Sequence, residues 1–371
     1  MSAVVRTVRA RLAELMRQPY VWGLVAIVVL LLVNLAKDPG YLALSVNDQN
    51  GHVAGNLIDI MRAAAPILLI ATGMTLVIAT GGIDLSVGSI MVVSGAVSME
   101  FLQSAGADAG TQAAFTAVLL SLAIGTALGL VNGVLVAFVG LQPFISTLVM
   151  MLAGRGLAKV ITEGQNTASV NPSFRWISNG YVLGLPVVFF LAVAIVLVVG
   201  LVVRRSALGL LIEAIGVNLR AARMAGVKPR NLLLAVYVLS AFLASIAGLF
   251  ATATVMRVDV SRTGYQLELD AILAVVIGGT SLAGGRFSIR GAAVGALLIA
   301  TLNKTVVFLG IPSSATPAFK AIVIIVLCLM QSQQVLRWLE RRQPRPGPDV
   351  GPPRPDGTSE NASTQGARVS A

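Results

Sequence analysis

The sequence predicts an all-α integral membrane protein with about ten transmembrane helices and both termini in the cytoplasm. Three observations predict this class: a mean hydropathy of +0.86, a charged fraction of only 12%, and four long stretches without Asp, Glu, Lys or Arg. The stretches run from residue 63 to 83, 109 to 154, 176 to 203 and 231 to 256. A bilayer core about 30 Å thick requires about 20 apolar residues per helix, so each stretch holds at least one span. A soluble protein does not bury this many such helices.

Ten apolar segments fit as spans. They are residues 20–36, 57–80, 88–104, 112–138, 142–162, 182–203, 231–255, 268–284, 290–310 and 318–336. The 46 uncharged residues from 109 to 154 are two helices, because one helix of that length would extend about 70 Å. Gly140 and Pro143 mark the turn between them. The third and eighth segments are short, and eight crossings result if these two stop partway.

The orientation follows from the basic residues, which concentrate on the cytoplasmic side of membrane proteins. With ten spans, 18 of the 27 Lys and Arg residues fall on the side that holds both termini. The predicted organisation is a cytoplasmic N-terminal segment (1–19), a transmembrane domain (20–336) with a large cytoplasmic loop (204–230), and a disordered cytoplasmic tail (337–371). The first span is longer than the apolar part of a signal peptide, and we expect it to stay uncleaved.

Several functional classes are excluded by the positions of residues. The net charge of +11 does not indicate a nucleic-acid partner, because the basic residues flank apolar runs and aromatic residues make up only 5%. Cys328 is the single cysteine and His52 the single histidine, so no metal site or cofactor is expected. Gly279–Arg286 has the glycine spacing of a phosphate-binding loop, but Gly285 stands where the lysine belongs. We therefore expect no ATPase site, and no enzymatic activity, in this chain.

The segment Gly81–Ser89 combines two glycines with Asp84 and Ser86 inside an apolar region. A carboxylate at membrane depth costs about 3 kcal/mol on insertion scales, so it should face protein or water. Two interpretations stay open. Asp84 and Ser86 either cap the helix that starts near Gly88, or they gate or line a solute pathway.

Glycines recur on one helical face in two of the predicted spans. Gly125, Gly129 and Gly133 fall on one helical face, and Gly291 and Gly295 on another, which predicts close helix packing.

Two amides inside the spans, Asn132 and Asn303, should face the interior of the bundle. They are pathway candidates because neutral donors and acceptors suit sugar hydroxyls, although hydrogen bonds between helices use the same groups.

The largest internal loop contains Glu213–Gly226, whose small residues, two arginines and terminal glycine predict a short helix with a slim docking face. A helix resting on lipid would carry larger apolar residues on one side. This one suits insertion into a groove of a partner protein.

These segments, together with Leu269–Arg286, resemble the permease subunits of ATP-binding-cassette sugar importers of the ribose, xylose and galactofuranose group. The resemblance covers about residues 50 to 335, and Gln266–Ser288 is most similar to galactofuranose-type permeases. It implies a multi-pass permease of the bacterial cytoplasmic (inner) membrane that translocates a pentose or hexose. It also implies three partners: a cytoplasmic ATPase, a periplasmic sugar-binding protein, and a second permease chain, identical or homologous.

In this family the segment Glu213–Gly226 corresponds to the part that couples the permease to its ATPase. The residues that the resemblance assigns to this contact are Glu213, Ala214, Gly216, Asn218, Arg220, Ala221, Arg223 and Gly226.

The competing hypothesis is a secondary, ion-coupled transporter, which would need buried ionisable groups. The acids at membrane depth are few, namely Asp84, Glu100, Glu268 and Asp270.

Overall fold

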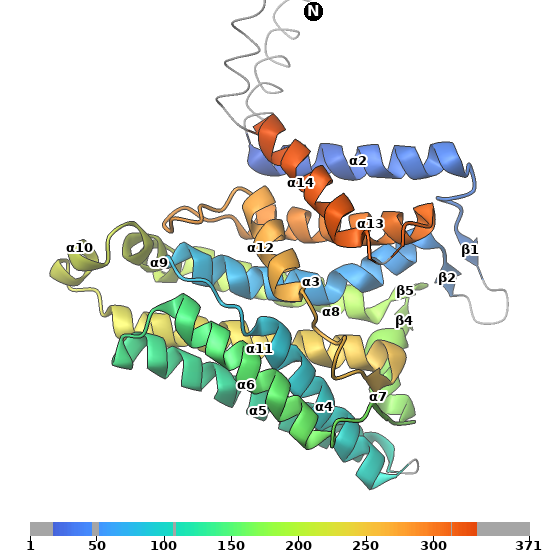
Figure 1. Cartoon of the computed structure of the whole chain (residues 1–371), viewed down its shortest axis with the longest axis horizontal. Helices are drawn as coiled ribbons and strands as arrows, with labels where there is room; N and C mark the ends of the chain where they lie inside the picture. The colour runs from blue at the N-terminus through green and yellow to red at the C-terminus, as the bar shows by residue number, and fades with distance from the viewer. Residues whose placement is uncertain (1–17, 47–51, 107–108, 313, 332–371) are drawn as a thin grey trace, which may run out of the picture. The chain divides into compact units, whose positions relative to one another are not determined.

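The computed structural model describes residues 18–46, 52–106, 109–312 and 314–331 of the chain (Figure 1). The expected tail, residues 337–371, and all but the last two residues of the expected segment 1–19 lie outside this part. Their predicted cytoplasmic location therefore stays a prediction.

The described chain is helical throughout the predicted membrane domain. The helices are α2 (Pro19–Lys37), α3 (Asn56–Ala79), α4 (Val87–Ala105), α5 (Gly110–Val134), the π-helical turn η1 (Leu135–Val139), α6 (Pro143–Ile161), α7 (Pro172–Asn179), α8 (Val187–Arg205), α9 (Leu208–Val217), α10 (Leu219–Met224), α11 (Pro229–Val255), α12 (Leu267–Ile277), α13 (Ile289–Leu309) and α14 (Thr316–Gln331).

Three short antiparallel strand pairs lie in the connections between helices. They are β1 (Ser45–Val46) with β2 (Val53–Ala54), β3 (Thr167–Ala168) with β6 (Arg257–Val258), and β4 (Tyr181–Val182) with β5 (Leu185–Pro186). Each strand has two residues. They pin loops together and leave the helical class unchanged.

Each predicted span contains a helix, and eight helices of the described residues are long and apolar enough to cross a membrane. The turn predicted in the longest uncharged stretch is confirmed: η1 ends at Val139, Gly140 takes a left-handed φ of 83°, and α6 begins at Pro143. The third span is not short, because α4 has 19 residues. The eighth span is short, as predicted, because the 11 residues of α12 extend only about 16 Å.

The centre of the bundle is formed by α3 and α11. In the most apolar part of α3, 78% of the residues are buried, whereas the corresponding value for α2 is 22%. α3 contacts α8, α11, α12 and α13, and α11 contacts α4 and α5. The outer helices expose apolar side chains, among them Val28 and Leu32 on α2 and Val160 on α6. Apolar outer faces of this extent indicate contact with lipid rather than water.

The two glycine faces predicted to pack are confirmed. A Cβ atom at Gly129 would stand 2.2 Å from Cβ of Ala241, where α5 crosses α11. A Cβ at Gly295 would stand 2.0 Å from the carbonyl oxygen of Ala274, where α13 crosses α12. Larger residues would force these helices apart. Small residues bring helix backbones close in lipid, where packing replaces the hydrophobic effect between helices.

The connections sort to two ends of the helices, as Figure 1 shows: α9 and α10 project from one end, and α7 with β4 and β5 lies at the other. Asn179 at the end of α7 donates to the carbonyl oxygens of Ala253 and Thr254, in the last turn of α11. The other end of α11 begins at Pro229, directly after the α10 segment. A bundle with two distinct ends can bind different partners on the two sides of a membrane.

The α5–α11 crossing gives a direct test of packing. We expect Gly129→Leu to lower the melting temperature and the yield of folded protein in detergent, because overpacking a tight contact destabilises by about 1–3 kcal/mol. The matched control is Gly156→Leu on α6, where an added Cβ meets no atom within 4 Å. Equal melting temperatures for the two variants would contradict the crossing described here.

Candidate functional site

The loop between α3 and α4 carries a carboxylate into the protein interior. The chain leaves α3 at Ala79 and turns at Gly81, whose φ of 80° is left-handed. Asp84 follows with 1% of its surface exposed, and Ser86 is fully buried. A buried carboxylate needs hydrogen-bond donors on both oxygens to offset its lost hydration.

Asp84 receives three such donors. Its Oδ1 accepts from the Ser86 backbone N–H at 3.0 Å and from the Ser86 hydroxyl at 2.5 Å, and its Oδ2 accepts from the Ser240 hydroxyl at 2.9 Å. Ser240 lies 11 residues from the start of α11, which is about 16 Å along the axis. The carboxylate is therefore bound at the middle of the central helix.

The observed geometry differs from the capping interpretation of Asp84 and Ser86. Ser86 is the N-cap of α4, but its side chain makes no capping hydrogen bond. Asp84 accepts the N–H of Ser86 itself rather than an N–H of the first helical turn. The physical reason is that Asp84 lies two residues before the N-cap, so its Oδ1 closes a local turn onto Ser86 while its Oδ2 accepts from Ser240 on α11. Asp84 thus ties the α3–α4 loop to α11.

The network continues through Asn132 on α5. Its Nδ2 donates to the Ser86 hydroxyl at 2.8 Å, and its Oδ1 accepts from the Ser146 hydroxyl of α6 at 3.3 Å. One chain of hydrogen bonds therefore connects α11, the α3–α4 loop, α5 and α6. We call Asp84, Ser86, Asn132, Ser146 and Ser240 the polar latch.

Three of the four pathway candidates, Asp84, Ser86 and Asn132, come together in the polar latch, and Asn303 does not. Asn303 lies half-buried on α13, which packs against α2, α3 and α12 rather than α5 or α6. The sequence missed Ser146 and Ser240, which were indistinguishable from other single serines inside apolar spans.

A cavity of about 470 Å³ lies beside the loop that carries the latch. It is lined by Thr80, Gly82, residues 136–143, Ile215, Leu219, Arg223, Arg230 and Leu233. Gly82, which lies two residues before Asp84, and Arg223 of the predicted docking segment both line this cavity.

The docking segment is two helices rather than the single helix predicted. Asn218 breaks it with an extended φ of −158°, and its Oδ1 accepts the N–H groups of Arg220 and Ala221, both at 3.0 Å. An asparagine N-cap of this kind starts a new helix, α10. Asn218, Arg220, Ala221, Arg223 and Gly226 are exposed, as is Met224 at 91%. Glu213 and Ala214, in α9, are half-buried.

Gly216 faces inward and is not part of a free docking surface. A Cβ at this position would stand 1.9 Å from the carbonyl oxygen of Ala79 and 2.3 Å from the backbone nitrogen of Gly285. The Gly285 N–H donates to that same carbonyl at 2.9 Å. A Cβ at Gly284 would stand 3.0 Å from the backbone nitrogen of Gly81. We call Gly81, Gly216, Gly284 and Gly285 the glycine junction. Gly216→Trp would therefore disrupt internal packing rather than block a partner.

Comparison with known proteins identifies relatives along most of the chain. The family described as branched-chain amino acid transport system / permease component matches residues 56–330. A fructose import permease protein of Bifidobacterium longum is 52% identical over 326 residues, which cover 87% of this chain and 90% of the relative. No solved structure matches the chain.

Two further relatives come from Escherichia coli K12. A galactofuranose transporter permease protein is 44% identical over 317 residues, covering 84% of this chain and 89% of the relative. A ribose import permease protein is 37% identical over 317 residues, covering 84% and 93%.

The geometry of the polar latch predicts different effects for two substitutions of Asp84. Asp84→Ala should strongly lower the melting temperature of the purified protein, because each buried donor left without an acceptor costs about 1–3 kcal/mol. Asp84→Asn should be milder, since its oxygen can still accept from Ser86 while its amide donates to the Ser240 hydroxyl. Ser240→Ala, which removes one donor, should lie between Asp84→Ala and the unmodified protein. A melting temperature of Asp84→Asn as low as that of Asp84→Ala would contradict the predicted order.

Proposed function

The chain belongs to this permease family, and from that premise we propose that it translocates a monosaccharide into the cytoplasm as the membrane subunit of an ATP-binding-cassette importer. The observation that carries the proposal is the near full-length similarity to three permeases named for fructose, galactofuranose and ribose. Because the identity to the two hexose permeases is higher, 52% and 44% against 37%, a hexose is the favoured substrate.

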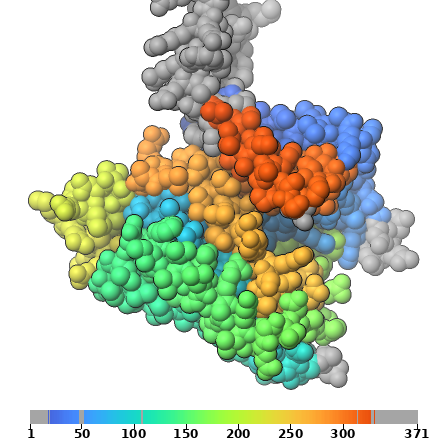
Figure 2. Space-filling view, in the orientation of Figure 1, coloured from blue at the N-terminus to red at the C-terminus, as the bar shows by residue number. Residues whose placement is uncertain are grey.

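The ATPase contact in this proposal is made by α10 and the end of α9. This segment projects from the helix bundle (Figure 2, yellow-green) and exposes Arg220, Arg223 and Met224. The rigid start of α10, fixed by Asn218, gives a partner a defined helix to grip. A slim helix with two cations suits an acidic groove. ATP hydrolysis then takes place on the separate subunit.

Movement of that segment reaches the polar latch through the glycine junction. Gly216 of α9 touches the end of α3 and the α12–α13 loop at backbone distance, without flexible side chains between them. A displacement of α9 therefore shifts Gly81 and the loop that holds Asp84. Backbone contacts transmit such displacements because closely packed interiors have little room to absorb them.

The polar latch would hold one of the conformations of the transport cycle. Alternating access requires helix groups to rock against one another, and hydrogen bonds across α5, α6 and α11 oppose such rocking. Asp84→Asn that assembles normally but loses most uptake would assign the carboxylate charge itself to gating.

The opposite end of the bundle offers a surface for the sugar-binding protein. A hollow of about 470 Å³ there is lined by His52, Arg62, Pro172, Arg175, Trp176, Asn179, Gly180 and Tyr181. The Tyr181 ring stacks on His52 at a centroid distance of 3.9 Å, and the Tyr181 hydroxyl oxygen accepts a hydrogen bond from Arg62 at 2.5 Å. The second permease chain would cover part of the exposed apolar faces that the outer helices present.

The membrane-depth acids give limited support to an ion-coupled mechanism. Asp270 forms an ion pair with Lys320 at 2.9 Å, and Glu100 accepts a hydrogen bond from Thr167. Carboxylates held in this way anchor structure. Glu268 differs, because its Oε2 is buried without a partner among the described residues.

Energy coupling separates the two mechanisms. We expect the permease, reconstituted with its ATPase and binding protein in liposomes, to accumulate labelled fructose, galactose or ribose only when ATP is inside. An ionophore that collapses ion gradients should leave this uptake unchanged. Uptake that persists without the ATPase and stops with the ionophore would establish the ion-coupled alternative instead.

The contact between α10 and the ATPase can be tested by charge reversal. Arg223→Glu should leave the permease folded in the membrane but reduce ATPase co-purification at least tenfold, because reversing a desolvated charge costs a few kcal/mol. Arg175→Glu is the matched control, since it makes the same change on an exposed arginine of α7 at the opposite end. Normal ATPase recovery with Arg223→Glu would refute the assigned contact.

A further inference from the structure

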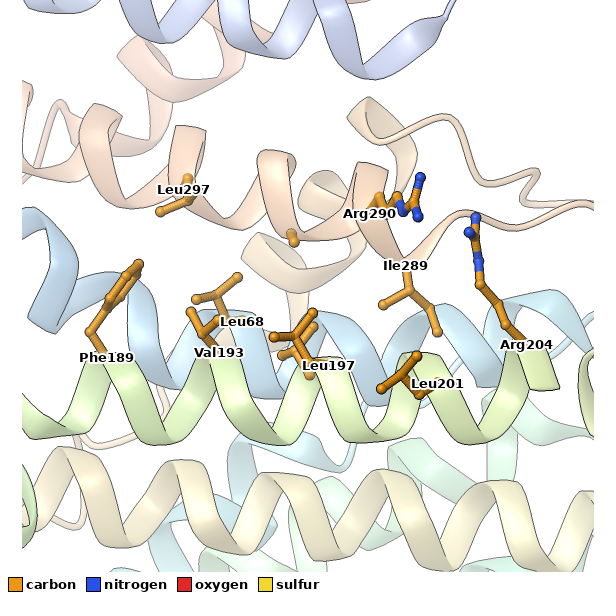
Figure 3. Close-up of a pocket in the computed structure, with 12 residues that line it drawn as sticks. Leu68, Phe189, Val193, Leu197, Leu201, Arg204, Ile289, Arg290 and Leu297 are labelled. Carbon is orange, nitrogen blue, oxygen red and sulfur yellow. The ribbon is translucent and has the colours of Figure 1, made fainter. Parts of the chain in front are cut away.

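A long apolar groove lies between α8 and α13, with α3 at its floor (Figure 3). Its volume is about 240 Å³. The lining residues are Leu68, Phe189, Val193, Val196, Leu197, Gly200, Leu201, Arg204, Ile289, Arg290, Ala293 and Leu297. Ten of these twelve are apolar or glycine, and Leu197 and Leu201 are exposed at the rim. The groove therefore opens from the helix surface that faces lipid.

The two polar lining residues are both arginines, and both lie at the same end. Arg204 is in the last turn of α8, and Arg290 is the second residue of α13. Figure 3 shows both guanidinium groups beside this end of the groove. Within the part of the chain that the structure describes, neither arginine forms an ion pair, since the two ion pairs there are Lys304–Asp59 and Lys320–Asp270. Two neighbouring cations without a counterion attract an anion.

We propose that this groove binds one anionic phospholipid, with an acyl chain along the apolar wall and the phosphate between Arg204 and Arg290. Arg204 lies 15 positions after Phe189, a distance of about 22 Å along the helix, which is enough to cover one leaflet of a hydrocarbon core about 30 Å thick. Guanidinium groups bind phosphate through paired, charge-assisted hydrogen bonds. Basic pockets between transmembrane helices on the cytoplasmic side are suited to acidic lipid headgroups.

Lipid binding in this groove is a property beyond the proposed transport function. It rests on that function in one respect, because the same membrane orientation decides which leaflet supplies the lipid. α9, the segment that we assign to the ATPase contact, begins at Leu208, four residues after Arg204. The arginine end therefore lies on the side of that contact, where the inner leaflet supplies anionic lipid. A lipid in this position would brace α8 against α13 beside the start of α9.

Lipid retention by the purified chain tests the proposal without any transport assay. Native mass spectrometry would measure lipid bound to the protein in detergent after exposure to dioleoyl phosphatidylglycerol or, separately, dioleoyl phosphatidylcholine. We expect preferential retention of phosphatidylglycerol. The double variant Arg204→Gln/Arg290→Gln should weaken its binding about 30-fold. The matched control Arg205→Gln/Arg286→Gln, which removes two neighbouring arginines outside the groove, should bind like the unmodified chain.

A second variant separates groove binding from surface attraction. Gly200→Leu places a side chain in the groove and leaves both arginines in place, so it should also lose phosphatidylglycerol while its melting temperature stays normal. Inorganic phosphate at equal concentration should not compete, because it has no acyl chain.

Three results would overturn the proposal. The first is equal retention of the two lipids by the unmodified chain, and the second is equal phosphatidylglycerol binding by the double variant and its control. The third is a disulfide-linked dimer of Leu197→Cys in a Cys328→Ala background, in membranes, because a second copy would then occupy the groove. Loss of lipid binding leaves the ATP-dependent uptake experiment unaffected, so each hypothesis can fail alone.

Discussion

A polar group that this chain carries into the hydrocarbon layer is costly unless it is hydrogen-bonded within the protein, and the arrangement of the central helices depends on that constraint. Asp84 is the clearest case, because its carboxylate is buried at the middle of α11 and holds three donors. Ser86 and Asn132 extend the same network to α5 and α6. One buried acid and its hydrogen-bonded neighbours thus link four elements of the bundle.

Close backbone contacts at glycines also hold the helices together. Gly129 and Gly295 let helices cross at backbone distance, which secures the bundle in a solvent that gives no hydrophobic drive between helices. Gly216 makes a contact of the same kind with Ala79 and Gly285, but it joins the projecting segment to the loop of the polar latch. The same kind of contact therefore packs the spans and, in the mechanism that we propose, transmits movement at their end.

The two ends and the lipid-facing side of the molecule have different chemistry. One end presents the arginines of α10, and the other presents an aromatic and cationic hollow around Tyr181. The side of α8 and α13 presents an apolar groove that ends in Arg204 and Arg290. A permease that meets an ATPase, a binding protein and lipid needs such separate surfaces, because each partner offers different complementary groups.

The sequence by itself determined where the apolar helices lie along the chain, because a hydrocarbon solvent imposes length and apolar character on each span, and the turn at Gly140–Pro143 follows from local backbone preference. It also marked Asp84, since a charge at membrane depth is rare and needs a partner. Only the tertiary structure decided which partner. Ser240 is 156 residues away, and neither the inward position of Gly216 nor the separation of Asn303 from the latch leaves a local signal. Such contacts depend on which helices are neighbours in the bundle, and the residue pattern within one helix does not encode this.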